Sequence, residues 1–310
     1  MYQSIIKKIK NFLFVAKSSL NHPLNKNMKI KTIFKIIIFF FKKRINLKKE
    51  IIISWVNNSK FIYTNNDPHL KWNIYHGLSD FEGMMFLLHV LRSDNTFIDV
   101  GSNIGTYTIL ASKVVGSKSI SFEPHPVTFE KLKKNINLNS IKKSVIAISK
   151  GIGSEISKKK FSNFTGDKGP LNRISSDLKN ENDINIDVST LDVEININSE
   201  YLIKIDVEGY EYHVLKGGKK ILENKKLIGI IIETNSMTKK YGYNNEEVAN
   251  FLNSLGLFPI KYDPIKRKIE KIKNFEFNKN TIFIRSFEKI EFLVKNAKQL
   301  KIHTAFNKSL

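Results

Sequence analysis

Cysteine is absent from the 310 residues of this chain. Without a thiol, the protein has no disulfide framework, no thiolate zinc site and no cysteine nucleophile. Long apolar runs are missing as well. The segment Ile33–Phe41 is apolar except for Lys35, but it is far shorter than the ~20 residues that span a bilayer. No cleavage site of small residues follows it closely, and we therefore predict no signal peptide.

Acidic residues are scarce at both ends of the chain. Residues 1–60 carry a net charge of +13 and residues 261–310 carry +8, whereas residues 61–260 carry only +1 of the total of +22. Strongly basic segments are typical of nucleic-acid-binding proteins. The chain is also rich in Lys, Asn and Ile together, as AT-rich coding would produce, so part of this charge needs no partner. We expect no nucleic acid among the partners.

A strand, a glycine turn, a helix and a second strand follow one another between Thr96 and Pro124. The backbone N–H groups of such a turn and helix start are expected to face a bound ligand. A carboxylate after the second strand, here Glu123, can accept hydrogen bonds from both hydroxyls of a ribose. The segment therefore predicts a nucleoside cofactor at the carboxyl edge of a parallel sheet.

The turn lacks the G-x-G-x-x-G spacing of dinucleotide-binding proteins. Its glycines, Gly101 and Gly105, are separated by three residues, and Asp99 lies two residues before the first. A carboxylate there repels phosphate and attracts a cationic ligand such as S-adenosylmethionine (SAM). The pattern favours SAM over NAD, and an NAD-dependent oxidoreductase is the alternative. The expected cofactor-binding residues are Asp99, Gly101, Ser102, Asn103, Gly105, Glu123 and Pro124.

A second motif, Tyr201–Gly218, places two carboxylates at the end of another strand of buried type. Asp206 and Glu208 lie there, and ligands of open α/β sheets bind outside the carboxyl ends of the strands. If the methyl acceptor is a hydroxyl, a base must remove its proton. We predict Asp206 as that base and Glu208 as the second catalytic candidate. Capping of the following helix is the competing role, which we give to Glu208 or Glu211.

We expect no metal in this site. The alternative is Mg²⁺ held by Asp206 together with Glu233 and Asn235, which end the neighbouring strand predicted at Leu227–Glu233. Oxygen ligands of this kind suit Mg²⁺, which could bind an acceptor hydroxylate.

Four short motifs together resemble the FkbM family of SAM-dependent methyltransferases: DVGSNIG from Asp99, FEP from Phe122, KIDVEG from Lys204 and VLKGG from Val214. The similarity runs from about residue 81 to about residue 285. It implies a Rossmann-like class I methyltransferase fold, with three αβα layers around a mostly parallel sheet. It also implies O-methylation of a hydroxyl on a sugar, glycolipid or small metabolite.

An RNA methyltransferase that uses the basic termini is another alternative. Enzymes that methylate exocyclic amines usually carry an Asn- or Asp-Pro-Pro-aromatic element after the fourth strand, where this chain has Asp206-Val207-Glu208-Gly209. Two carboxylates would also repel a phosphate backbone near the reaction centre.

We divide the chain into a basic, partly amphipathic helical extension (1–60), a methyltransferase domain (61–285, with its core at 94–285) and a C-terminal helix and tail (286–310). Residues 150–200 are expected to form hairpins and loops that shape the acceptor side. Further strands are predicted at 145–148 and 281–285, and helices at 80–91, 106–115, 126–136, 210–222, 246–255 and 287–300.

The N-terminal extension has a helical apolar stripe that includes Ile9 and Leu13, while Phe14 and Val15 interrupt its polar side. Two interpretations remain open. The helix rests on an anionic membrane surface, or it packs on the catalytic domain. We prefer the second, because sequences related to this one often carry helical extensions there. The expected location is the cytoplasm, with peripheral contact to the inner membrane face as the alternative.

Overall fold

The computed structural model describes residues 2–45, 50–64, 70–164, 172–175, 182–272, 279–302 and 308–309. The chain forms two compact units: Met1–Ser79 with Gln299–Leu310, and Asp80–Lys298. The larger unit differs at both ends from the methyltransferase domain predicted at 61–285. Parts of the predicted hairpin region at 150–200 and of the predicted tail at 286–310 lie outside the described residues.

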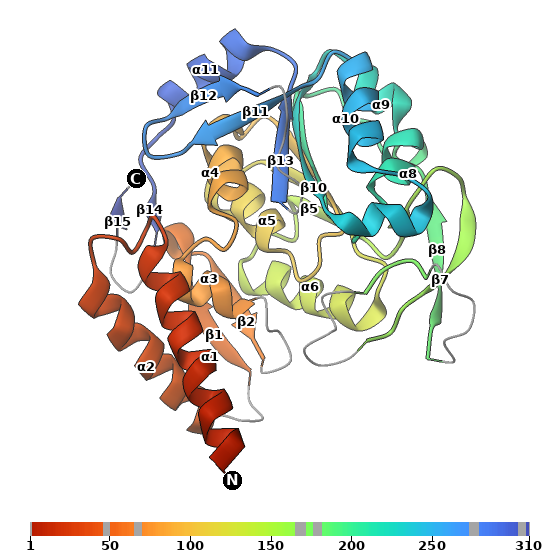
Figure 1. Ribbon diagram of the computed structural model, residues 1–310. Helices are drawn as coiled ribbons and strands as arrows, with labels where there is room; N and C mark the ends of the chain where they lie inside the picture. Colours follow the sequence, from red (N-terminus) through yellow and green to blue (C-terminus); the bar gives the residue numbers. More distant parts are fainter. Residues whose placement is uncertain are drawn as a thin grey trace. The chain divides into compact units, whose positions relative to one another are not determined.

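The smaller unit begins with two helices and a short β-hairpin (Figure 1). In the hairpin, a 3₁₀ turn at Val56–Asn58 connects two antiparallel strands. The predicted helical character of the extension is confirmed. Among the described residues, no helix is both long enough and apolar enough to cross a membrane. The elements of this unit are α1 (Tyr2–Asn21), α2 (Lys29–Ile45), β1 (Ile51–Ser54), β2 (Lys60–Tyr63), α3 (Leu70–His76), β14 (Lys301–Ile302) and β15 (Lys308–Ser309).

The larger unit is built on an eight-stranded sheet with the order β12-β11-β13-β10-β9-β3-β4-β5. The five strands from β10 to β5 are parallel, and the three at the other edge are antiparallel. This confirms the predicted mostly parallel sheet. The strands are β3 (Thr96–Val100), β4 (Lys118–Phe122), β5 (Val145–Ile148), β9 (Tyr201–Ile205), β10 (Leu227–Thr234), β11 (Phe258–Asp263), β12 (Lys268–Lys271) and β13 (Lys279–Ile284).

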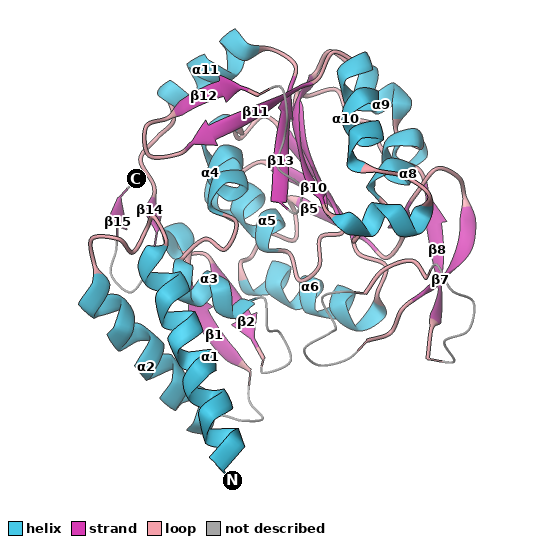
Figure 2. Ribbon diagram, in the orientation of Figure 1, coloured by secondary structure: helices cyan, strands magenta, loops and turns pink. Residues whose placement is uncertain are grey.

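Helices lie on both sides of this sheet, which gives the predicted three αβα layers (Figures 1 and 2). The strands β3 and β9 are buried along their whole length, as expected for parallel strands that are covered on both faces. The helices are α4 (Phe81–Val90), α5 (Thr106–Ile109), continued by a π-helical turn at Leu110–Val115, α6 (Pro126–Leu138), α7 (Leu191–Glu194), α8 (Glu211–Lys216), α9 (Lys219–Glu223), α10 (Asn245–Ser254) and α11 (Phe287–Lys295).

The predicted single helix at 210–222 is wrong, because the structure divides it into α8 and α9. The break falls at Gly217 and Gly218. A Cβ atom on Gly217 would lie 1.9 Å from the carbonyl oxygen of Gly153, and one on Gly218 would lie 2.9 Å from the side chain of Leu191. The two glycines therefore allow another segment of the chain to pack against the helix break.

A small three-stranded sheet lies in the segment where hairpins were predicted. Its order is β6-β8-β7, with β7 and β8 antiparallel and β6 parallel to β8. Its buried side packs with Tyr210, which is 6% exposed and stacks on His213 at a ring-centroid distance of 4.1 Å. The strands are β6 (Gly151–Ile152), β7 (Ser157–Phe161) and β8 (Ile184–Ser189).

Candidate active site

The two glycine-containing motifs meet at the carboxyl ends of β3 and β9. The chain leaves β3 towards β4 on one side, while β9 pairs with β3 on the other. This is the switch point at which open α/β sheets bind ligands. The backbone N–H of Asp206 donates to the Val100 carbonyl at 3.0 Å. A Cβ atom on Gly101 would lie 1.9 Å from the Asp206 carbonyl oxygen, so only glycine permits this approach.

The turn itself differs from the prediction that its N–H groups face a ligand. Four of the five N–H groups at 101–105 donate within the protein: two to the Phe122 carbonyl, one to the Ser102 carbonyl and one to the Glu123 carboxylate. These groups are therefore unavailable to a pyrophosphate. The arrangement agrees with the preference for SAM over NAD, because SAM carries no phosphate.

Glu123 lies at the end of β4 with its carboxylate against the turn. Its Oε2 accepts from the Asn103 N–H at 3.0 Å, and its Oε1 accepts from the His125 N–H at 2.9 Å. The residue is 6% exposed. Burial raises the pKa of Glu123 to about 7, although both N–H groups oppose the shift. Each oxygen keeps further acceptor capacity for a ribose hydroxyl, so the carboxylate fits its predicted partner. Pro124 follows and is half-buried.

Asp99 lies within β3 and connects the strand to α5. Its Oδ2 accepts from the Thr108 hydroxyl at 2.6 Å, and the same hydroxyl lies 2.7 Å from that of Ser121. Burial raises the pKa of Asp99 to about 6, with the Thr108 hydrogen bond acting against it. The contact with Thr108 therefore positions α5 relative to β3.

Three carboxyl groups gather beside the turn. Oxygens of Asp206, Glu208 and Glu233 all lie within 4.8 Å of one another. Glu208 has a left-handed backbone with a φ of 54°, which is unusual for a residue other than glycine. Burial and then the charge of Asp206 raise the pKa of Glu208, while the charge of Asp206 is the largest cause that raises the pKa of Glu233. At neutral pH, this cluster therefore retains a proton.

Asn235 lies beside this cluster and hydrogen-bonds to one of its members. Its Nδ2 donates to Glu233 at 3.0 Å, and its Oδ1 accepts from the Met237 N–H at 2.8 Å as an N-cap. Glu208, which the metal alternative did not include, has an oxygen close to those of Asp206 and Glu233. The carboxylates could supply oxygen ligands to a divalent cation, and the set of Asp206, Glu233 and Asn235 stays a prediction.

The sequence interpretation missed a buried polar network around Lys204. The Lys204 ammonium is 2.9 Å from Asp206 Oδ2 and 3.0 Å from Asn280 Oδ1. Asn280 donates to Asp80 at 2.7 Å, and the Tyr107 hydroxyl donates to the same carboxylate. Burial alone would lower the pKa of Lys204, but nearby carboxylates, Asp206 foremost, raise it. The available signal was a lysine in an otherwise apolar strand, since fully buried lysines are almost always paired.

Asp80 is also the N-cap of α4. Its Oδ1 accepts from the Gly83 N–H at 3.2 Å and caps α4. One carboxylate therefore connects the start of a helix to the Lys204 network.

Glu211, not Glu208, holds the loop between β9 and α8. Its Oε1 accepts from the Val207 and Gly209 N–H groups, each at 3.1 Å. Its Oε2 is buried with no hydrogen-bond partner among the described residues. Burial raises the pKa of Glu211 to about 7. The predicted helix cap is thus replaced by a carboxyl group that orders the loop carrying Asp206 and Glu208.

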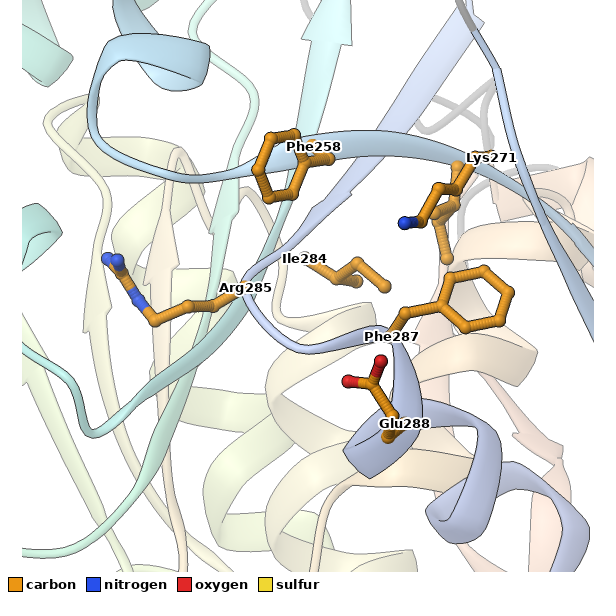
Figure 3. A pocket seen from close by; sticks show the side chains of 7 residues that line it. Phe258, Lys271, Ile284, Arg285, Phe287 and Glu288 are labelled. Atoms are coloured by element: carbon orange, nitrogen blue, oxygen red, sulfur yellow. The ribbon is translucent and has the colours of Figure 1, made fainter.

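A separate small pocket lies at β11, β13 and α11 (Figure 3). Its volume is about 160 Å³, and Ile284 in its wall pairs with Gly229 near the start of β10. Asp206 follows β9 and Glu233 is the last residue but one of β10, so both lie at the opposite, carboxyl ends of these strands. The pocket is therefore not the site of the predicted cofactor or of the three carboxyl groups.

A three-layer αβα fold with this glycine turn and with carboxylates at the carboxyl edge of its parallel strands is the architecture expected of a class I SAM-dependent methyltransferase. The profile of the methyltransferase FkbM domain matches residues 99–257. The match covers just over half of the chain, and the protein belongs to this family. The expected family and enzyme class are therefore confirmed, and the NAD-dependent oxidoreductase is excluded.

Two relatives are methyltransferases by name. The hexuronic acid methyltransferase AglP of Haloferax volcanii is 25% identical over 60% of this chain and 73% of its own length. Methyltransferase 1 of Beauveria bassiana is 27% identical over 40% of this chain, and the match spans 58% of that protein. A TehB-like SAM-dependent methyltransferase from Corynebacterium glutamicum superimposes with a TM-score of 0.38 at 12% identity, covering 72% of this chain and 98% of the other. That superposition is too loose to add to the assignment.

Proposed function

We propose that this enzyme transfers the methyl group of SAM to a hydroxyl of a sugar, either free or within a glycolipid. The observation that carries the proposal is the position of Asp206, which follows β9 directly beside the cofactor turn while its side chain is 37% exposed. A hydroxyl is a weak nucleophile until its proton leaves, and a carboxylate at this point can accept that proton. The relative that methylates a hexuronic acid supports a sugar as the acceptor class.

The residues of the turn and of β4 would hold the cofactor. In the proposal, Glu123 accepts hydrogen bonds from the ribose hydroxyls. The nucleoside lies against a surface formed by Gly101, Ser102, Asn103, Gly105 and Pro124. Bound SAM supplies an activated methyl group on a sulfonium. The protein then has to align the acceptor, and such positioning can lower the barrier by ~7–11 kcal/mol.

We assign the base to Asp206 and an assisting role to Glu208. Lys204 holds one Asp206 oxygen at 2.9 Å, which fixes the carboxylate in orientation. Glu208 lies within the same cluster, and its raised pKa keeps a proton on Glu208, so that Asp206 remains the charged carboxylate that acts as the base. A metabolite hydroxyl other than a sugar would meet the same geometry.

We further propose that the reaction needs no metal. The Lys204 ammonium already neutralises Asp206 from within the protein. A divalent cation bound to the same carboxylate would lie close to this ammonium and would be repelled by it. Activity that persists in excess chelator supports this part of the proposal, and activity that is lost and then restored by Mg²⁺ contradicts it.

The acceptor proposal is tested by incubating the enzyme and SAM with a panel of sugars, including uronic acids and their lipid-linked forms. Mass spectrometry and digestion then show whether a methyl ether forms on the sugar. Transfer to RNA but not to any sugar would favour the RNA methyltransferase instead.

The base is tested with Asp206→Asn. We expect turnover to fall by ~10²–10⁴-fold, while calorimetry shows nearly unchanged binding of S-adenosylhomocysteine. Asp187→Asn makes the same chemical change on a side chain that is 66% exposed, and it should leave turnover intact. If Asp206→Asn retains turnover and Glu208→Gln loses it, the base is Glu208.

A further inference from the structure

Helix α2 presents an apolar face that no described residue covers. Five large side chains on this face are between 37% and 77% exposed. Their spacing of four, three, one and three residues places them along one side of the helix. We name this set the α2 stripe, and its members are Ile30, Phe34, Ile37, Ile38 and Phe41.

The opposite face of α2 is the one that anchors the helix. Ile36 is fully buried and Phe39 is 4% exposed. The Phe39 ring meets Tyr63 edge-on at 5.1 Å and Tyr75 at 5.6 Å. These contacts anchor the helix in its unit, and the α2 stripe takes no part in them.

Helix α1 extends the exposed apolar surface. Ile9 and Leu13, which belong to the stripe seen in the sequence, are 53% and 60% exposed, whereas Val15 is buried. The sequence pattern thus located the helix correctly but not the face that is buried. The two helices are in contact, with the rings of Phe12 and Phe40 at 5.8 Å.

The charges around this surface are almost all positive. Residues 1–79 contain 15 Lys and Arg and only two acids, Glu50 and Asp67. The exposed lysines of α1 and of the turn before α2 include Lys10, Lys17 and Lys26. Long lysine side chains beside apolar residues can extend their ammonium groups to the headgroup level of a bilayer.

We propose that the α2 stripe, with the exposed edge of α1, binds the surface of an anionic lipid bilayer. Because no described helix can span a membrane, the helices lie in the interface with their apolar side chains in the acyl boundary. This inference goes beyond methyl transfer and does not depend on which hydroxyl is methylated.

The charge and the side-chain types of this surface favour a bilayer over a second protein chain or a nucleic acid. A second copy of the chain would bring its own basic surface against this one, and like charges oppose such pairing. The Ile and Phe side chains offer a nucleic acid no hydrogen-bond donors. An anionic bilayer satisfies both features at once, since apolar burial and lipid charge act together.

The test is co-sedimentation of the full chain with vesicles of phosphatidylcholine alone and with vesicles that also contain phosphatidylglycerol. We expect binding to the anionic vesicles only, and weaker binding in high salt, because exposed charge interactions are screened. Phe34→Gln combined with Phe41→Gln should weaken the binding by about 10-fold or more, as two Phe side chains leave the acyl boundary.

Phe292→Gln is the matched control, because Phe292 is 67% exposed on α11 of the other unit and Phe34 is 63% exposed. It should leave vesicle binding unchanged. Circular dichroism and the S-adenosylhomocysteine-induced thermal shift verify that each variant is folded. Three outcomes would overturn the proposal: no binding to anionic vesicles, equal binding by the double variant, or a self-association in solution that the double variant abolishes.

Discussion

Glu211 combines complete burial with an acceptor role towards two backbone N–H groups of the β9–α8 loop. Folding raises its pKa from 4.5 to about 7. The folded protein therefore keeps a proton that the unfolded chain has lost in this range. Relative to high pH, the proton on Glu211 stabilises the folded state by about 3 kcal/mol. This stabilisation is fully present below about pH 4.5 and is lost as the pH rises through about 7.

We predict that Glu211→Gln flattens this pH dependence. The amide oxygen can still accept from the loop, but the side chain no longer titrates. Between pH 5 and 7, the unfolding free energy of the variant should fall less steeply than that of the wild type, by about 1.4 kcal/mol per pH unit. Urea unfolding at several pH values measures the slopes. Glu130→Gln, on a side chain that is 63% exposed, is the control, and an unchanged slope in Glu211→Gln would contradict the assignment.

At the residue scale, the sequence located the carboxylates but not all of their tasks. Asp206, Glu208 and Glu123 follow strands, and their positions could be predicted from the motifs alone. The pairing of Lys204 with Asn280 joins residues 76 positions apart. No local pattern predicts such a contact, because it depends on the placement of β13 beside β10.

At the scale of the elements, a glycine with a left-handed backbone begins the turn after β3, and another ends the helix that follows it. Gly101 has a φ of +77° and Gly116 a φ of +87°. Their surroundings differ. A Cβ atom on Gly101 would overlap the Asp206 carbonyl oxygen, whereas one on Gly116 would meet only the Ser93 Cβ at 3.8 Å.

These two glycines give a matched pair of substitutions. Gly116→Ala should cost about 1–2 kcal/mol, the penalty of a left-handed backbone. Gly101→Ala should cost about 3 kcal/mol or more, because β9 must also move away from the turn. It should also weaken S-adenosylhomocysteine binding, which Gly116→Ala leaves unchanged. Urea unfolding and calorimetry measure both quantities, and equal costs for the two variants would show that the close approach is unimportant.

The elements themselves were predictable where local chemistry decides them. The cap at Asp80, the proline start of α6 and the apolar strands β3, β9 and β10 all follow from neighbouring residues. The strands β11 and β12 were missed. The insertion of β13 between β10 and β11 is a choice among strand partners far apart in the chain, and the sequence of one strand does not specify its neighbour.

At the scale of the whole molecule, the chain has two compact units, and the candidate active site lies in Asp80–Lys298. We predict that differential scanning calorimetry of the full chain resolves two transitions. A ligand that binds one folded unit raises only the transition of that unit. S-adenosylhomocysteine at ~100 times its dissociation constant adds about 2.7 kcal/mol, or roughly 5–10 °C for a unit of this size. A single transition that shifts as a whole would contradict independent unfolding.

The sequence by itself determined the family, the cofactor class and the carboxylates of the site, because these depend on residue types at short spacing. Only the tertiary structure decided which N–H groups of the turn are already bonded, which acids share a proton and which face of α1 and α2 is exposed. Each of these depends on contacts between segments far apart in the chain. Burial and electrostatic interactions depend on which residues are close in space, and the order of residues in the sequence does not specify this.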